Sequence, residues 1–148
     1  AVISIMLLLI FKSFKVMVIG LIPNIFVASS VMGLLGLLKI PLDIMTITVA
    51  AISVGMAVDN TIHYIYRYKK EFKKTNSVEQ ALENAHTTTG RAIFYTATTI
   101  AAGFCILSLS NFFPTVLFGL FTSLAMVLAF ITSLTVLPNL LVKYKVFQ

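Results

Sequence analysis

Five apolar runs alternate with shorter polar segments along the chain. The runs cover residues 1–11, 16–38, 44–66, 92–110 and 115–142. The last four have lengths that suit helices crossing about 30 Å of hydrocarbon, which takes about 20 residues. The pattern predicts an all-α membrane protein, a bundle of five transmembrane helices forming one domain fragment over residues 1–148.

The first run, AVISIMLLLIF, is too short to cross a bilayer. It has neither the basic start nor the small-residue cleavage site of a signal peptide. We therefore expect it to be the truncated end of a membrane helix, and the chain to be a piece of a larger protein.

Composition supports the membrane class. Of the 148 residues, 59% are hydrophobic and 11% are charged, whereas a soluble domain carries about a quarter charged residues. The net charge of +6 does not indicate nucleic-acid binding, because the basic residues cluster at the ends of apolar runs. A single cysteine, Cys105, excludes a disulfide within the chain.

The polar segments alternate between basic and neutral. Lys12–Lys15, Arg67–Arg91 and the tail after residue 142 are basic. Lys39–Asp43 carries one Lys and one Asp, and Asn111–Pro114 carries no charge. Basic loops are retained in the cytoplasm. We therefore expect the basic loops and the C-terminus to be cytoplasmic, in a multi-pass protein of the plasma or inner membrane.

The connector 67–91 contains a weaker helical pattern. Asn76 and Ser77 are suitable helix caps. Apolar residues then follow at helical spacing: Val78, Ala81, Leu82 and Ala85. A solvated connector and an amphipathic helix on the membrane surface both stay open. Gly90 is expected to let the chain turn into the next span.

An aspartate interrupts the apolar run 44–66. In GMAVDNTIHYIYRYKKE, Asp59 lies about seven residues, or roughly 10 Å, from the predicted end of the span. A charge at that depth costs a few kcal/mol unless it has a partner, water or a proton. Asp59 is therefore predicted to be a proton or ion site. The alternative is a permanent ion pair, whose basic partner must come from outside these spans.

Helical spacing places two neighbours on the stripe of Asp59. His63, one turn later, is either a proton partner of the carboxylate or an interfacial side chain that reaches the headgroups. Gly55, one turn earlier, is predicted to allow the close approach of another helix. The sequence has no Cys/His metal spacing, nucleophile elbow or phosphate-binding glycine loop, so no enzyme, metal or cofactor is predicted.

The segment GMAVDNTIHYIYRYKKE resembles the fourth-helix motif of the RND superfamily of exporters. The pattern G-x-x-V-D-x-x-I-H is found in its MMPL-like and hydrophobe-exporter branch. The resemblance continues through TTTGRAIFYTATTIAAGF and the tail segment LTVLPNLL. Motif, loop length and helix order agree over essentially the whole chain.

The resemblance implies an architecture of twelve transmembrane helices in two halves. Each half has one helix, a large extracytoplasmic domain and then five helices. This chain would be the last five helices of one half, and the basic tail favours the second half. The implied partners are the lipid bilayer, the remaining half with the extracytoplasmic domains, and a hydrophobic or lipid-like substrate. A homo-oligomer stays open.

The resemblance also implies a proton relay for transport. Asp59 matches the intramembrane acidic residue of the fourth helix, and Thr96 is similar to a relay threonine on the neighbouring helix. Asn60 stands where the multidrug-pump branch often has a second Asp, which leaves the proton stoichiometry open. The implied relay is Asp59, Asn60, Thr96 and His63.

Two other classes of function remain open. One is a lipid-binding or regulatory membrane domain resembling sterol-sensing domains, which share this helix arrangement. The other is an accessory membrane subunit in which Asp59 only pairs helices. The sequence does not identify the substrate.

Overall fold

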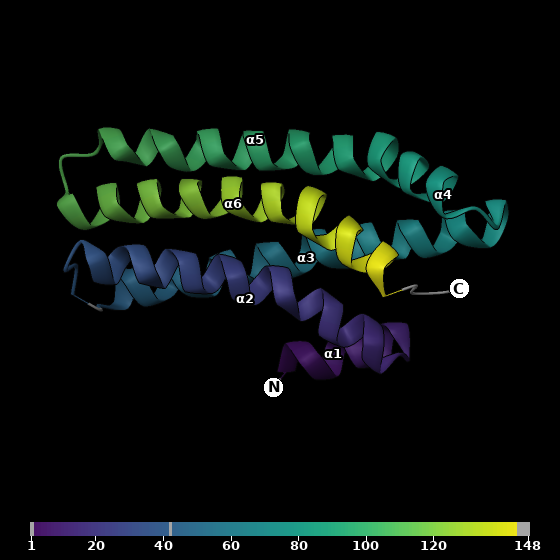
Figure 1. Cartoon of the computed structure of the whole chain (residues 1–148). Coiled ribbons are helices and arrows are strands. Elements are labelled where there is room, and N and C mark those ends of the chain that lie inside the picture. The colour runs from purple at the N-terminus through teal and green to yellow at the C-terminus, as the bar shows by residue number, and fades with distance from the viewer. Residues whose placement is uncertain (1, 42, 145–148) are drawn as a thin grey trace.

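The computed structural model describes residues 2–41 and 43–144, which are almost entirely helical (Figure 1). Its elements are α1 (Val2–Phe11), α2 (Phe14–Leu37), α3 (Ile44–Thr75), α4 (Val78–Ala85), the π-helix η1 (His86–Gly90), α5 (Arg91–Ile106), the 3₁₀-helix η2 (Leu107–Leu109) and α6 (Phe113–Lys143). The prediction of an all-α chain is confirmed.

Four helical stretches among the described residues are long and apolar enough to cross a bilayer. They are Phe14–Leu37, Ile44–Thr75, Val78–Leu109 and Phe113–Lys143. The third combines α4, η1, α5 and η2 into one path. The remaining helix, α1, has 10 residues and is shorter than a span. The described residues therefore form four spans of full length and one short first helix, which agrees with the prediction of five helices of which the first is truncated.

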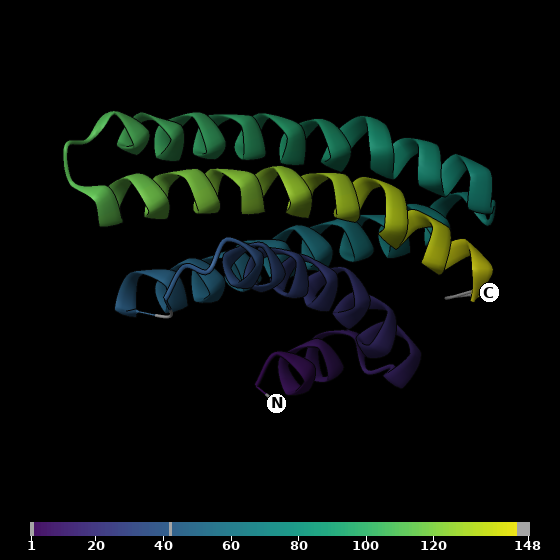
Figure 2. The same ribbon diagram turned by 60° about the vertical axis from the view of Figure 1, so that its left-hand side comes forward.

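Helix α3 lies at the centre of the bundle and packs against both α2 and α6. Outside this core, α5 runs along α6, and α1 packs beside one end of α2, as both ribbon views show (Figure 2). Val27, Ala57 and Ala129 meet where the three central helices touch. Small side chains at such a point let helix backbones approach closely.

The connector between the second and third spans is helical over most of its length. Helix α3 continues beyond the predicted end at Tyr66 to Thr75, and the chain reverses at Asn76, whose φ of 50° is left-handed. Ser77 occupies the N-cap position of α4 without a side-chain cap bond. The expected turn at Gly90 is wrong, because that glycine is helical, with φ −59° and ψ −42°.

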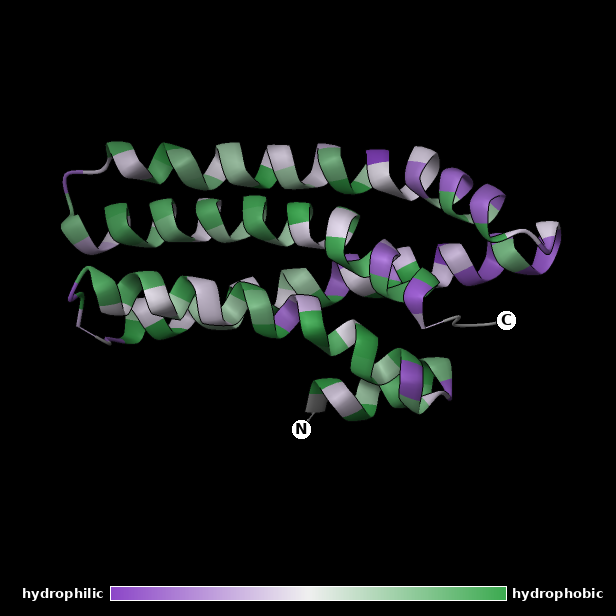
Figure 3. Ribbon diagram, viewed as in Figure 1, coloured by the Kyte–Doolittle hydropathy of each residue, from purple (hydrophilic) through white to green (hydrophobic). Residues whose placement is uncertain are grey.

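Polar residues gather at one end of the bundle (Figure 3). This "basic end" holds Lys12, Lys15, Lys143 and the segment 67–91. The opposite "neutral end" holds the turn from α2 to α3 and the turn from η2 to α6. The alternation of basic and neutral loops therefore corresponds to two opposite ends of one bundle.

A capping box starts α3 at the neutral end. The Thr46 backbone N–H donates to Asp43 Oδ1, and the Asp43 N–H donates to Thr46 Oγ1, both at 2.8 Å. The Thr46 backbone bond holds the pKa of the Asp43 carboxyl below its usual value. The cap is therefore formed at neutral pH and is lost only as the pH falls through that lowered pKa.

Candidate functional site

Asp59 and His63 form a pair on the surface of α3. His63 Nε2 lies 3.3 Å from Asp59 Oδ1, and the two side chains are 67% and 70% exposed, respectively. The i,i+4 spacing in one helix explains the contact. Asp59 lies fifteen residues after Ile44, about 22 Å along the helix from the neutral end. In a bilayer with about 30 Å of hydrocarbon whose edge lies at Ile44, the pair would fall within the hydrocarbon region, nearer the basic end.

The face of α3 that carries this pair is uncovered. Gly55, Asp59, His63 and Tyr66 are all exposed, so the stripe expected from helical spacing is present on one side. A Cβ at Gly55 would meet no atom within 4 Å. The close helix contact predicted there is therefore not made by the described part of this chain, and it requires a helix from elsewhere.

Asn60 faces a different environment from Asp59. It is 7% exposed, and its Nδ2 has no hydrogen-bond partner among the described residues. Successive residues of a helix point in directions about 100° apart around its axis. Asn60 therefore points into the bundle while Asp59 points out of it. The two residues are adjacent in sequence but do not form one site.

Thr96 is also apart from the carboxylate. Its hydroxyl is exposed on α5 and donates to the Ala92 carbonyl at 2.9 Å, within its own helix. No hydrogen bond joins it to Asp59 within residues 2–41 and 43–144. Of the four predicted relay residues, the structure brings together only Asp59 and His63.

A buried asparagine on α2 was missed by the sequence interpretation. Asn24 is 3% exposed; its Nδ2 donates to the Gly20 carbonyl and to Thr61 Oγ1 on α3. Its Oδ1 has no partner in the described part of the chain. The available signal was an amide side chain directly after Pro23 in an otherwise apolar run. Asn24 and Asn60 thus give the bundle interior two unpaired polar atoms, which water could satisfy.

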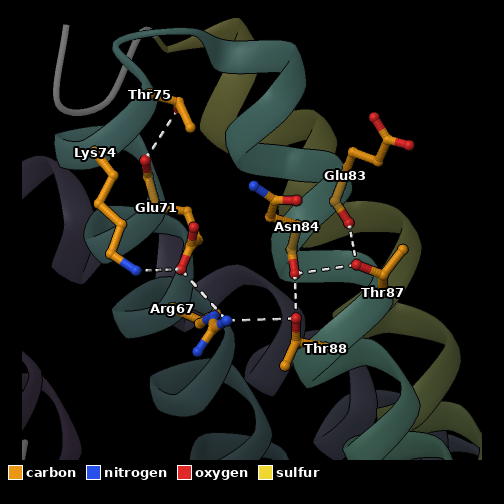
Figure 4. A network of polar contacts seen from close by, with 8 residues as sticks. All are labelled: Arg67, Glu71, Lys74, Thr75, Glu83, Asn84, Thr87 and Thr88. Atoms are coloured by element: carbon orange, nitrogen blue, oxygen red, sulfur yellow. Dashed lines mark hydrogen bonds and ion pairs between the residues drawn. The ribbon is translucent and has the colours of Figure 1, made fainter.

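Polar contacts at the basic end join α3 to α4 and η1 (Figure 4). Glu71 is buried; its Oε1 forms an ion pair with Arg67 Nη2 at 3.3 Å and accepts a hydrogen bond from Lys74 Nζ at 3.4 Å. Arg67 also reaches Thr88 Oγ1 at 3.4 Å, and Thr88 donates to the Asn84 carbonyl. The i,i+4 spacing of Arg67 and Glu71 could have predicted their ion pair from the sequence, but only if α3 was expected to continue past Tyr66.

A second link across this end involves His86. The hydroxyl of the buried Tyr64 lies 3.1 Å from His86 Nδ1, and the rings meet edge to face with centroids 6.0 Å apart. The π-helix is therefore tied to α3 at both Tyr64 and Arg67. Within the described ranges, no group of three or more His, Cys, Asp or Glu side chains could hold a metal ion.

Long apolar helices around a tightly packed core, with charged residues collected at the basic end, define a multi-pass membrane protein. Residues 1–144 match the sequence profile of the MMPL family. The chain therefore belongs to the MMPL family, within the RND superfamily, as its sequence motifs predict.

Three relatives illustrate this membership. The chain is 34% identical over 110 residues to the membrane protein MJ1562 of Methanocaldococcus jannaschii. The aligned region covers 74% of this chain and 28% of that protein. It is 32% identical over 124 residues to the hopanoid transporter HpnN of Rhodopseudomonas palustris. This alignment covers 80% of this chain and 14% of the transporter. The hopanoid transporter HpnN of Burkholderia multivorans is 30% identical over 133 residues. This alignment covers 86% of this chain and 15% of the transporter.

The chain spans less than a third of the length of each of these relatives. No solved structure matches the chain significantly.

Proposed function

We propose that this chain is part of the membrane domain of a proton-coupled exporter of hydrophobic or lipid-like substrates, and that Asp59 is the residue that takes up and releases the proton. The observation that carries the proposal is a carboxylate within a membrane-length helix whose partner in the described chain is a histidine. The names of the two HpnN relatives support a lipid-like substrate.

The chemistry of the pair suits proton transfer. A carboxylate within hydrocarbon is costly as an anion and much less so when it is neutral. His63 Nε2 lies 3.3 Å from Asp59 Oδ1, and an imidazole can both donate and accept a proton, so His63 can pass a proton to or from Asp59. Protonation removes the charge from this face of α3, which changes what the face packs against most favourably. Helix packing then differs between the two protonation states, and this difference drives the transport cycle.

The uncovered face around Asp59 supports a partner outside this chain. An exposed carboxylate on a membrane helix is expected to face protein or a water-filled cavity, not acyl chains. The remaining half of the same transporter is the proposed cover, and Gly55 allows it to approach closely. Thr96, exposed on α5, would then join the relay from the assembled protein. In this assembly the basic end is cytoplasmic and the extracytoplasmic domains lie beyond the neutral end.

The test is Asp59→Asn in the full-length protein, reconstituted into vesicles with an imposed pH gradient. We expect substrate flux to fall to that of protein-free vesicles, because Asn cannot carry the proton, while membrane insertion and monodispersity are retained. Asp43→Asn is the matched control, since Asp43 caps α3 outside the span. Normal gradient-driven flux by Asp59→Asn would rule the proposal out.

A lipid-binding regulatory domain is the second candidate function. The observation in its favour is an apolar cavity of about 550 Å³ between α2 and α6, lined by Leu34, Leu38, Leu117 and Leu124 among others. This function predicts lipid binding that is unchanged by Asp59→Asn, together with no gradient-driven flux by the unaltered protein.

A further inference from the structure

A groove runs between α5 and α6, and no residue of α3 lines it. At the basic end it opens as a cavity of about 410 Å³, which includes Arg91, Phe94, Tyr95 and Phe130 in its lining. A second cavity of about 330 Å³ continues it toward the neutral end, along Ala97, Ala101 and Cys105. Phe130 lines both cavities, so they adjoin at its side chain, and we refer to the two together as the groove.

The mouth of this groove carries an unpaired positive charge. Arg91 is exposed and makes no ion pair or hydrogen bond among the described residues. No acidic residue of the described part of the chain lines either cavity. His86 also lines the mouth, and only its Nδ1 is engaged, by Tyr64. A buried carboxylate neutralises Arg67 nearby, whereas nothing in the described chain neutralises Arg91.

The groove changes from cationic to aromatic to apolar along α5. Arg91 is the first residue of α5 at the basic end. Phe94 and Tyr95 follow one turn later, 48% and 67% exposed, and Phe94 packs on Phe130 with ring centroids 5.6 Å apart. Aromatic side chains favour the interface between headgroups and hydrocarbon. Beyond them the lining is mostly small and apolar, including Ala97, Ala101 and Ala102.

The length of the groove fits one lipid leaflet. From Arg91 to Cys105 the helix rises about 21 Å at 1.5 Å per residue. One leaflet contributes about 15 Å of hydrocarbon and, together with its headgroup region, about 20–22 Å. A ligand with an anionic head at Arg91 could therefore lay a full acyl chain along the groove without leaving its leaflet.

We propose that this groove binds an anionic phospholipid from the leaflet at the basic end, with its phosphate on Arg91 and an acyl chain between α5 and α6. Basic pockets between membrane helices are suited to such headgroups. Charge complementarity selects an anionic over a zwitterionic lipid, and the apolar continuation selects a lipid over free phosphate. The site is independent of Asp59 and of whether the protein transports anything.

The experiment measures lipid binding to the full-length protein in detergent by native mass spectrometry. Phosphatidylglycerol and phosphatidylcholine of the same chain length are titrated separately. We expect tighter binding of phosphatidylglycerol, which Arg91→Gln weakens about fivefold because one cation near anionic lipid is lost. Lys143→Gln is the matched control: it removes a positive charge at the same end, outside the groove, and should leave binding unchanged.

Further variants test the groove itself. Arg91→Lys keeps the charge and should keep most of the binding. Ala102→Phe fills the apolar part of the groove and should weaken the binding of phosphatidylglycerol. It should not affect folding, since Ala102 is exposed. Millimolar inorganic phosphate should not displace the lipid. Asp59→Asn should bind lipid normally, which separates this site from the proposed proton site.

Three results would overturn the proposal. They are equal binding of the two lipids, unchanged phosphatidylglycerol binding by a monodisperse Arg91→Gln, and full displacement by inorganic phosphate, which would indicate a simple anion site.

Discussion

Asp59 and Asn60 are adjacent residues in very different surroundings. One is exposed on the outer side of α3 and the other is buried in the bundle. The contact between Asp59 and His63 follows from i,i+4 spacing, so it could be predicted from the sequence. The burial of Asn60 could not. In a membrane both the lipid and the protein interior are apolar, so hydropathy does not indicate which face of a helix is covered.

A glycine governs the packing of α5 against α6. A Cβ at Gly119 would lie 2.5 Å from the Phe104 carbonyl oxygen and 2.7 Å from Leu107 Cβ. The Phe104 carbonyl oxygen belongs to the backbone of α5, so it can move aside only if the helix itself shifts. We predict that Gly119→Ala destabilises the protein by about 1–3 kcal/mol, typical of overpacking, as measured by thermal unfolding of the full-length protein in detergent.

Gly103→Ala is the matched control for this prediction. A Cβ at Gly103, on the opposing helix, would meet nothing within 4 Å. Alanine is also the better helix former by about 1 kcal/mol, so stability should stay equal or rise. An unchanged melting temperature for Gly119→Ala would contradict the geometry of this contact.

At the scale of elements, the ends of the helices are set by residues that hydropathy does not detect. The apolar run ends at Tyr66, but α3 continues to Thr75 because polar residues there remain good helix formers and pair along the helix, as Arg67 does with Glu71. The sequence therefore predicts the membrane-embedded part of α3 but not its full length. The helix start expected at Asn76 and Ser77 is present, with Ser77 as the N-cap of α4, whereas Gly90, expected to be a turn, is helical.

Three helices end in a left-handed residue that is not glycine. Lys12 follows α1, Lys39 lies just beyond α2 and Asn76 follows α3, with φ between 49° and 53°. Asparagine adopts this conformation more readily than other residues with a Cβ. The reversal from α3 to α4 thus takes place at Asn76, where a residue that tolerates the left-handed conformation is needed.

This dependence can be measured at Asn76. Asn76→Ala is predicted to lower the free energy of unfolding by about 1 kcal/mol relative to Asn76→Gly, because alanine has a Cβ penalty in the left-handed region. Asn84→Ala is the control, since Asn84 is exposed within the helical backbone of α4. The comparison uses thermal unfolding in detergent. Equal stability of the Ala and Gly variants at residue 76 would show that the turn tolerates other conformations.

For the whole molecule, the most informative feature is how little of the third span is covered. Only 11% of its most apolar window is buried, against 39–44% for the other three. Helix α5 packs principally against α6, so most of its surface is left to lipid or to other protein. The sequence predicted the number and order of the full-length spans well. It could not predict their neighbours, because apolar residues lie on every side of each span.

Orientation is the prediction that belongs to this scale. In a cysteine-free background of the full-length protein, which includes Cys105→Ser, Asn111→Cys at the neutral end should react with a membrane-impermeant maleimide in intact cells. Gln80→Cys at the basic end should react only after permeabilisation, because the positive-inside rule places that end in the cytoplasm. Both positions are exposed in the bundle. Labelling in the reverse order would contradict the proposed topology.

The π-helix between α4 and α5 has a geometric consequence for the whole bundle. A π-turn holds one residue more than an α-turn, and each residue of a helix turns the next by about 100°. The segment His86–Gly90 therefore acts as an angular spacer: it sets which side of α5 faces α6 and which faces outward. A protein with one residue fewer in this segment would keep both helices and both sequences, yet it would present a different surface of α5 to the bilayer.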